Sequence, residues 1–364
     1  MTISDENLYS EVLETVNNYD QEFTAEDMHI LDCLYRIFND ADFERKHPRD
    51  KDGKFTSGGG HTKEYISTFD KLAKDNLKDW TSEDIIQRAV AAYSKDYPEM
   101  TEENIKRAIS KADAYNKHVM DTHGDTQTKY SVKAKKGDKR IYSEERTKKH
   151  KEILKKLFEN KENAKPKNGE KPTAIFLGGR GGSGKSKFDM PTQKKPSNLG
   201  VYDRSKYIVL DADAIKEYLP EYKGYNAYEV HEESSDILKQ ALDIAKEEGL
   251  NVVLDATMKT VKSTEKRIKP FADADYNIEM YYMHLPREKA AERAVHRFMT
   301  GGEKDEQGNI IKEGRYVPLK VILEEMKENE EAFDKLKKYA SKWAFYNNDV
   351  PSIKDKPILI DKNY

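Results

Sequence analysis

Cysteine is almost absent from this chain, and long hydrophobic runs are absent altogether. Cys33 is the single cysteine among 364 residues, so no disulfide can form within the chain, which fits a reducing compartment. No run approaches the roughly 20 apolar residues of a membrane span, and the first residues lack the basic and apolar regions of a signal peptide. We therefore expect a cytoplasmic protein that has no membrane partner.

An excess of charge of either sign is also lacking. The chain has 64 Lys and Arg residues against 67 Asp and Glu residues, a net charge of -3, which does not favour nucleic acid as a partner. The histidines show no metal-ligand spacing, so a structural zinc site is not expected. The N-K-x-D segment that reads guanine is missing as well, which disfavours a GTPase.

The N-terminal third is predicted to be helical and interrupted. Residues 1–60 hold one predicted helix, from Ala25 to Phe38, followed by a flexible connector rich in charge and glycine. Residues 61–135 are predicted to form a small helical module, with Thr81 and Thr101 as helix N-caps.

Residues 140–364 are predicted to form an α/β domain whose mostly parallel central sheet is flanked by helices. Strands that alternate with helices favour such a sheet, and ligands bind at the carboxyl ends of its strands. The expected strands are Thr173–Leu177, Tyr207–Leu210, Asn251–Leu254, Ile278–His284 and Pro357–Ile360. The expected helices cover residues 143–160, 184–190, 213–218, 229–248, 286–299 and 318–343.

The segment from Thr173 to Ser186 carries the most chemical information. An apolar strand leads directly into G-x-x-x-x-G-K-S, the pattern of a phosphate-binding P-loop. Small residues let consecutive backbone N–H groups surround a phosphate, Lys185 can reach the β- and γ-phosphate oxygens, and the Ser186 hydroxyl can ligate Mg²⁺. The predicted nucleotide-binding residues are Gly179, Arg180, Gly181, Gly182, Ser183, Gly184, Lys185 and Ser186.

Carboxylates follow the next two predicted strands. Asp211 and Asp213 come directly after the second strand. One of them could accept a proton from an attacking hydroxyl, and the other could hold a Mg²⁺-bound water or cap the following helix. Asp255 follows the third strand in a Walker-B-like pattern, which orients Mg²⁺ or its waters. The sequence therefore predicts that Ser186 and Asp255 hold Mg²⁺.

Arginines follow the fourth predicted strand. Arg293 and Arg297 lie four residues apart and share one helix face, and Arg315 is on a loop before the next predicted helix. Cationic groups around the transferring phosphate supply much of the catalysis of phosphoryl transfer. These arginines are therefore candidate catalytic residues, and a solvated surface role is the alternative for each.

Together these motifs resemble the zeta toxin family. The resemblance rests on GGRGGSGKS, LDADAIKEYLPEY, the helix that opens with HEESS, NVVLDAT and the arginines of R…GRYVP, over about residues 140–345. Members of this family are P-loop kinases that phosphorylate the 3′-hydroxyl of UDP-N-acetylglucosamine. The resemblance implies a P-loop kinase fold for residues 140–364, and a nucleotide-sugar kinase that uses ATP or GTP together with Mg²⁺.

The resemblance also implies roles for individual residues. Those implied for catalysis are Asp213 as the base, Lys185, Arg297 and Arg315. Those implied for substrate binding are Asp213, Glu233 or its neighbour Glu232, Asp255 and Thr257. The family can carry Glu where this chain has Asp255, and the inserted residues 301–312 affect the alignment of Arg315.

Alternative functions and partners follow from the same residues. The acceptor could be another small hydroxyl compound. The chain could also be a phage or mobile-element protein that binds nucleotide without sugar kinase activity, since KHPRDKDGKF at residues 46–55 resembles a short element of phage head-associated proteins. The family further implies an antitoxin, acting in trans or supplied in cis by the N-terminal module.

Overall fold

The computed structural model describes residues 79–123, 131–133, 141–304, 306, 310–324 and 328–364. The helix predicted at 25–38 and the KHPRDKDGKF segment lie outside these residues. Residues 80–364 belong to one structural unit, and the predicted domain boundary between residues 135 and 140 stays a prediction. Within the described part of the chain, no helix has the length and apolar character that a membrane span requires.

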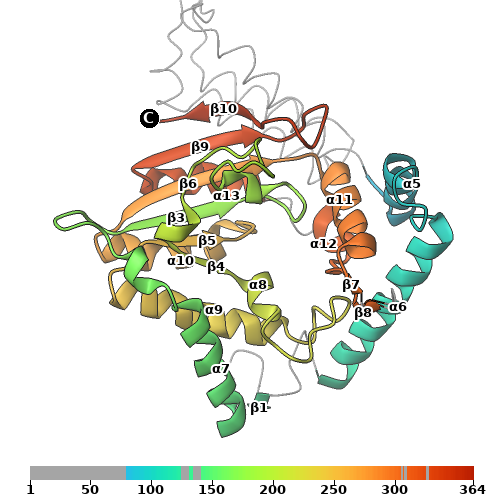
Figure 1. Cartoon of the computed structure of the whole chain (residues 1–364), viewed down its shortest axis with the longest axis horizontal. Helices are drawn as coiled ribbons and strands as arrows, with labels where there is room; N and C mark the ends of the chain where they lie inside the picture. The colour runs from blue at the N-terminus through green and yellow to red at the C-terminus, as the bar shows by residue number, and fades with distance from the viewer. Residues whose placement is uncertain (1–78, 124–130, 134–140, 305, 307–309, 325–327) are drawn as a thin grey trace, which may run out of the picture. The chain divides into compact units, whose positions relative to one another are not determined.

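A six-stranded sheet forms the centre of the described structure (Figure 1). Its strands lie in the order β10–β9–β6–β3–β5–β4, and all neighbours are parallel except β10, which is antiparallel to β9. The strands are β3 (Thr173–Gly178), β4 (Ile208–Asp211), β5 (Val252–Asp255), β6 (Asn277–His284), β9 (Lys342–Asn347) and β10 (Ile358–Lys362). All five predicted strands are present, and the predicted α/β class is confirmed.

The apolar strand sequences reflect burial on both faces of the sheet. In β3, Ala174 and Phe176 belong to the core on one face, whereas Ile175 and Leu177 belong to the core on the other. Successive side chains of a strand point to opposite faces, and a parallel sheet covered on both sides therefore needs a continuous apolar run.

Helices cover the face of the sheet to which Ala174 and Phe176 point. Their apolar side chains join one cluster with those of the strands. The elements on this side are α7 (Glu144–Leu157), the 3₁₀ turn η1 (Lys161–Ala164), α8 (Ala212–Lys216), α9 (His231–Glu247), α10 (Val261–Asp273) and α13 (Asn329–Leu336). Sequence analysis missed α10, although Thr260 is a standard N-cap whose hydroxyl accepts a hydrogen bond from the Ser263 amide.

The segment between η2 (Lys185–Phe188) and η3 (Arg204–Lys206) packs against the other face of the sheet. Phe188 and Tyr202 bury their rings against Ile175, Leu177 and neighbouring strand residues. The helix predicted at 184–190 is therefore wrong, because only one 3₁₀ turn forms. Asp189 already has an extended backbone, and Pro191 restricts the residue before it to extended conformations.

The single helix predicted at 318–343 is also wrong. The chain forms α12 (Leu319–Leu323), α13 and the 3₁₀ turn η4 (Lys337–Tyr339), and β9 starts at Lys342. Trp343 and Ala344 pair with Met280 and Tyr281 of β6. The hydrogen bonds and burial that the sheet offers outweigh the helix propensity of this lysine-rich segment.

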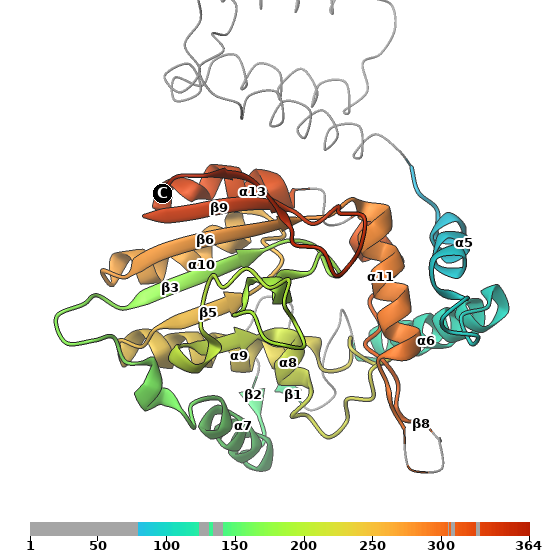
Figure 2. The same cartoon turned by 45° about the horizontal axis from the view of Figure 1, so that its top comes forward.

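Two helices from the N-terminal module pack beside α11 (Arg287–Thr300), on its side away from the sheet (Figures 1 and 2). They are α5 (Ser82–Tyr93) and α6 (Glu102–His123). The predicted N-caps are confirmed, since Thr81 forms a capping box with Asp84 and the Thr101 hydroxyl accepts from the Asn104 amide. Two antiparallel strand pairs complete the described elements: β1 (Ser131–Lys133) with β2 (Ile141–Tyr142), and β7 (Glu303–Lys304) with β8 (Ile310–Lys312).

Candidate active site

The carboxyl ends of β3, β4 and β5 bring the predicted site residues to one edge of the sheet. Leu177 pairs with Asp255, and Asp255 pairs with Asp211 on the next strand. The P-loop begins directly after β3, so it lies beside both carboxylates. Strand order reverses at β3, which has β5 on one side and β6 on the other, and such a switch point is where α/β sheets bind ligands.

The P-loop glycines are required by its backbone geometry. Gly182 has φ +90°, and a Cβ there would lie 2.5 Å from the Ala290 carbonyl oxygen of α11. Gly184 has φ +93°, and a Cβ there would lie 2.4 Å from the side-chain nitrogen of Asn348. Both positions combine left-handed backbone with close packing, so only glycine fits.

Lys185 folds back over the loop toward the carboxylate edge. Its Nζ donates to the Gly179 carbonyl at 2.9 Å and lies 3.7 Å from Asp255 Oδ1. The ammonium group therefore lies between the P-loop backbone and the Asp255 carboxylate.

Residues far from the P-loop in the sequence contact it and hold its backbone in place. The buried side chain of Asn348, which follows β9, donates to the Ser183 carbonyl at 2.7 Å and accepts from Lys187 at 3.2 Å. Sequence analysis missed Asn348 because it did not predict β9. Arg293 of α11 also lies beside Gly184, with its Nη1 3.9 Å from where a Cβ there would be.

Arg180 has a partner inside the protein. It is buried and pairs with Glu330 of α13 at 3.3 Å, while His284 Nδ1 lies 3.3 Å from the same carboxylate. Burial alone would raise the pKa of Glu330, but Arg180 and His284 outweigh it and lower this pKa to about 2. The structure therefore turns Arg180 toward α13, although it was predicted to bind nucleotide.

A pocket of about 350 Å³ lies next to the carboxylate edge. Its lining comes from β4, α8, the end of α11 and the β7–β8 region, and consists of Asp211, Asp213, Ala214, Glu217, Arg297, Gly301, Glu303, Lys312, Glu313 and Arg315. Three of the four residues that the sequence predicted as catalytic, Asp213, Arg297 and Arg315, thus meet in one cavity.

Asp213 and Arg315 form an ion pair in this pocket, and Lys216 Nζ lies 2.9 Å from the other Asp213 oxygen. Burial alone would raise the pKa of Asp213, but Lys216 and Arg315 outweigh it and hold the pKa well below its usual range. Asp213 is therefore a carboxylate throughout the physiological pH range and can accept a hydrogen bond from a hydroxyl group.

Asp211 has the opposite electrostatic character. It caps α8 by accepting a hydrogen bond from the Asp213 amide at 2.8 Å, so the predicted capping role is present. Burial first, and then the charges of Asp255 and Asp213, raise its pKa to about 6. The carboxylates at this edge repel one another, which favours a cation or a proton between them.

Arg297 is a guanidinium with unused hydrogen-bonding capacity. Its buried Nε and Nη2 have no hydrogen-bond partner among the described residues, and neither does Nε of Arg315. Burial, followed by the charge of Arg315, lowers the pKa of Arg297 to about 10. Two arginines that line one pocket are suited to an anion that contacts both.

Of the metal and substrate residues predicted from the sequence, Asp255, Ser186 and Thr257 lie near the P-loop, whereas Glu233 lies elsewhere in the fold. Asp255 is partly exposed at the sheet edge, and Ser186 is exposed at the start of η2. Thr257 follows Asp255, and its carbonyl accepts from the Gly179 amide at 3.4 Å. No group of three His, Cys, Asp or Glu side chains that could hold a metal occurs in the described part of the chain. A hydroxyl and a carboxylate are nevertheless the few protein ligands that Mg²⁺ takes beside substrate phosphates.

Glu233 is not brought to the pocket. It is fully buried in α9, where Arg146 Nη2 donates to Oε2 at 3.0 Å and His150 Nε2 lies 2.6 Å from Oε1. Both carboxylate oxygens are therefore occupied by α7. Arg146 and His150 stand four residues apart on that helix, and an arginine and a histidine on one buried face were the signal in the sequence for an acidic partner.

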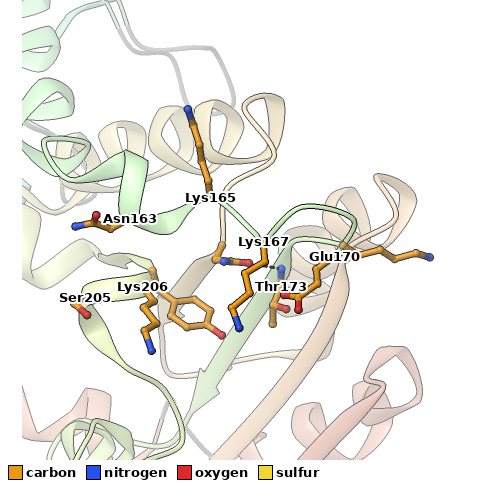
Figure 3. A pocket seen from close by; sticks show the side chains of 10 residues that line it. Asn163, Lys165, Lys167, Glu170, Thr173, Ser205 and Lys206 are labelled. Carbon is orange, nitrogen blue, oxygen red and sulfur yellow. Dashed lines mark hydrogen bonds between the residues drawn. The ribbon is translucent and has the colours of Figure 1, made fainter.

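A larger hollow, of about 610 Å³, lies at the opposite edge of the sheet, near the amino ends of β3 and β4 (Figure 3). Lysines line it, but Lys165 points away from Lys167 and Lys206 (Figure 3), and Lys165 and Lys206 pair with their own neighbours Glu162 and Asp203. The hollow lacks the P-loop, the carboxylate pair and the arginines, so it is not the candidate site.

Solved structures from two systems are among those to which this chain is similar. A chain of the PezAT chromosomal toxin–antitoxin system of Streptococcus pneumoniae is 14% identical, with a TM-score of 0.42, over 61% of this chain and 81% of that one. A chain of the AvrRxo1-ORF1:AvrRxo1-ORF2 complex with sulphate ions is 16% identical, with a TM-score of 0.44, over 61% and 68%. A chain of the same complex with ATP is 14% identical, with a TM-score of 0.44, over 61% of this chain and 68% of that one.

Comparison with sequences places most of the described α/β unit in one family. None of the curated proteins matches this chain. The family model described as zeta toxin, however, matches residues 155–355. The matched part is more than half of the chain and includes the P-loop, both aspartates of the pocket and its two arginines.

Proposed function

Because this chain belongs to the zeta toxin family, we propose that it is an ATP-dependent kinase that phosphorylates the 3′-hydroxyl of UDP-N-acetylglucosamine. The observation that carries this proposal is that Arg297 lines the same pocket as Asp213 and Arg315, and that its buried Nε and Nη2 have no hydrogen-bond partner among the described residues. A partly buried guanidinium whose buried N–H groups lack a partner costs folding free energy. Its place beside a P-loop is explained by a phosphoryl group that arrives with the substrate.

Helix α11 connects the donor and acceptor halves of the proposed site. Its Ala290 carbonyl contacts Gly182, Arg293 lies beside Gly184 one turn later, and Arg297 reaches the pocket after a further turn. The acceptor hydroxyl would attack the γ-phosphorus between the P-loop and the pocket while the bond to the β-phosphate oxygen breaks, and Arg293 and Arg297 would neutralise the charge of the transferring group. Phosphoryl transfer depends mainly on such positioning and charge stabilisation.

Asp213 and Asp211 would have different roles at the acceptor hydroxyl. Asp213, held as a carboxylate by Lys216 and Arg315, would orient the attacking hydroxyl by accepting its hydrogen bond. Asp211, whose pKa is raised to about 6, would be the better matched group to receive the proton near neutral pH. In a loose transition state for phosphoryl transfer, proton removal from the hydroxyl contributes little to the rate. Orientation of the hydroxyl by Asp213 therefore contributes more than proton transfer to Asp211.

Ser186 and Asp255 would hold the Mg²⁺ ion of this reaction. The residues fit that role by their chemistry, since a hydroxyl and a carboxylate are ligands that Mg²⁺ takes beside substrate phosphates, and the Asp255 carboxylate lies close enough to Asp211 to raise its pKa. Bound there, the ion would neutralise the charge of the β- and γ-phosphates. Lys185, which lies 3.7 Å from Asp255, would contact the same phosphates from the loop side.

The outer part of the pocket suits a hydroxyl-rich acceptor. Glu217, Glu303 and Glu313 line it together with Lys312, and carboxylates are strong acceptors for hydroxyl groups. Lys312 pairs with Glu217 in this structure, and we propose that it turns to the pyrophosphate of the nucleotide sugar. Membership of the family also supports an antitoxin partner in trans.

Transfer of ³²P from γ-labelled ATP to UDP-N-acetylglucosamine tests the proposal directly. We expect labelled sugar nucleotide from the wild type, and a loss of roughly 10²–10³-fold in rate for Lys185→Ala and for Asp213→Asn. Asp361→Asn, on the edge strand β10, is the matched control and should keep full rate. GTP in place of ATP tests the choice of donor.

The outcomes separate the alternatives. Equal labelling by the wild type and both site variants would exclude transfer at this site. Labelling of another sugar, nucleoside or amino acid in an acceptor screen would keep the kinase and replace its acceptor. Tight ATP binding without transfer to any acceptor would favour a nucleotide-binding protein of another role.

A further inference from the structure

Helix α6 contacts both of the loops that lie next to the acceptor pocket, although it lies outside the residues 155–355 that match the family model. Its contacts come from residues 111–116, about one and a half turns of helix. Figure 2 shows α6 beside α11, away from the sheet. No residue of 79–123 lines the pocket, so α6 can influence the site only through these loops and α11.

The first loop carries Arg315, and α6 holds it on both sides of that residue. The buried Tyr316 hydroxyl donates to Asp113 Oδ1 at 2.5 Å, and Lys111 Nζ pairs with Glu313 at 2.8 Å. The ring of Tyr316 also packs against Phe298 of α11, with ring centroids 4.9 Å apart. The backbone on either side of Arg315 is therefore fixed by contacts that do not involve the pocket.

The second loop connects α8 to α9. Tyr115 donates its hydroxyl to Glu229 at 2.8 Å, and the side chain of Asn116 donates to the Tyr225 carbonyl at 3.2 Å. Both acceptor residues lie just before α9, so consecutive residues of α6 hold this loop next to the first one.

The two loops are also joined to each other and to α11. The Glu313 amide donates to the Lys223 carbonyl and the Tyr316 amide to the Gly224 carbonyl, both at 3.2 Å. A Cβ on Gly314 would lie 2.2 Å from the Arg297 carbonyl oxygen. The loop before Arg315 is thus in direct contact with the backbone of the second pocket arginine.

We propose that α6 is a positioning element of the phosphoryl-transfer site, which fixes Arg315 against Asp213 and Arg297 through Asp113 and Tyr316. This inference rests on the proposed function. Asp113 and Tyr316 are positioning residues, since neither lines the pocket. A displacement of about 1 Å in a group that stabilises a transition state can lower a rate by as much as about 10²-fold.

A positioning role for α6 and inhibition in cis by the N-terminal module predict opposite effects on the rate of transfer. An inhibitory module would have to be loosened for activity, so weakening its contacts would raise the rate. A positioning helix must stay in place, so weakening its contacts lowers the rate.

The test compares three variants of the full-length chain. Asp113→Ala removes the acceptor of the Tyr316 hydroxyl, and we expect kcat to fall about tenfold while KM for ATP changes less than about twofold. Asp113→Asn keeps an oxygen in the same place and should restore most of kcat. Asp121→Ala, the matched control on the same helix, should leave kcat unchanged.

Hydrogen exchange provides a readout that does not depend on activity. The Glu313 and Tyr316 amides, which are hydrogen bonded in the wild type, should exchange faster in Asp113→Ala, while the amides of β3 and β5 keep their rates. A rise in kcat, or unchanged kcat together with unchanged exchange, would overturn the proposal. If the wild type transfers no phosphate to any acceptor, the proposed function fails, and the exchange of these two amides still decides whether α6 holds the loop.

Discussion

Two clusters of charged residues in this protein are built in opposite ways. Between α7 and α9, Arg146 donates two hydrogen bonds to Glu221 at 2.8 Å each and further bonds to Glu233, which also meets His150. In the pocket, the aspartates repel one another and Arg297 keeps unused donors.

This difference separates structural charges from functional ones. A buried charge whose hydrogen-bonding groups are all used contributes to a unique packing, and it has nothing left for a ligand. A charge that is left incomplete costs folding free energy, and such sites persist where a ligand completes them. We therefore propose that the α7–α9 cluster stabilises the fold and that the pocket cluster serves phosphoryl transfer.

The largest effect should come from breaking the complete cluster. Arg146→Met leaves the buried Glu233 carboxylate facing His150 without its main partner, and we expect a loss of about 3–5 kcal/mol in the free energy of unfolding, measured in urea. The rate of transfer per folded molecule should not change. Arg204→Met, which removes an exposed ion pair with Asp189, should cost less than about 1 kcal/mol. A similar loss in both variants would contradict the comparison.

Removing a charge from the pocket cluster should lower the rate of transfer and leave the free energy of unfolding unchanged or higher. Arg297→Met removes a partly buried cation that has free donors, so the free energy of unfolding should stay the same or rise. The rate should fall by roughly 10²–10³-fold, because the transferring phosphoryl loses a stabilising group. Steady-state kinetics and urea unfolding of the same preparation measure both quantities. A fall in stability as large as that of Arg146→Met would show that Arg297 is structural.

The smallest effect concerns Asp211 and depends on pH. Its pKa is raised from 3.8 to about 6, so its ionisation destabilises the folded protein as pH rises from about 4 through about 6. Asp211→Asn keeps the α8 cap and should stabilise the protein by about 1–2 kcal/mol at pH 8. At pH 4 this gain should be absent. Thermal unfolding at the two pH values measures the difference, and an equal gain at both would rule out the charge as its cause.

Prediction from sequence worked best where a pattern is local. The strand before the P-loop, the helix caps at Thr81 and Thr101 and the carboxylates after the next two strands depend on a few neighbouring residues. Parallel pairing then places strand ends together automatically. The sequence therefore predicted that Asp211, Asp255 and the P-loop lie at the carboxyl ends of parallel strands, and the structure places them there.

Prediction failed where distant contacts decide. The segment 318–343 has helix-forming residues throughout, but β6 offers an open edge on which Lys342–Asn347 pairs. In HEESS, two adjacent glutamates are equivalent in the sequence, and only packing against Arg146 and His150 turns Glu233 inward. Asn348 supports the P-loop from more than 160 residues away, and no local pattern marks it.

The sequence by itself determined the donor half of the site. A strand, a glycine-rich loop, a lysine and a serine are adjacent in the chain, and their chemistry follows from their spacing. Only the tertiary structure decided the acceptor half. Asp213, Arg297, Arg315 and α6 come from four separate segments, and their meeting depends on burial of apolar surface between α6, α11 and the pocket loops. Such burial acts on surfaces that form only when the chain is folded, so the pocket cannot be read from any one stretch of sequence.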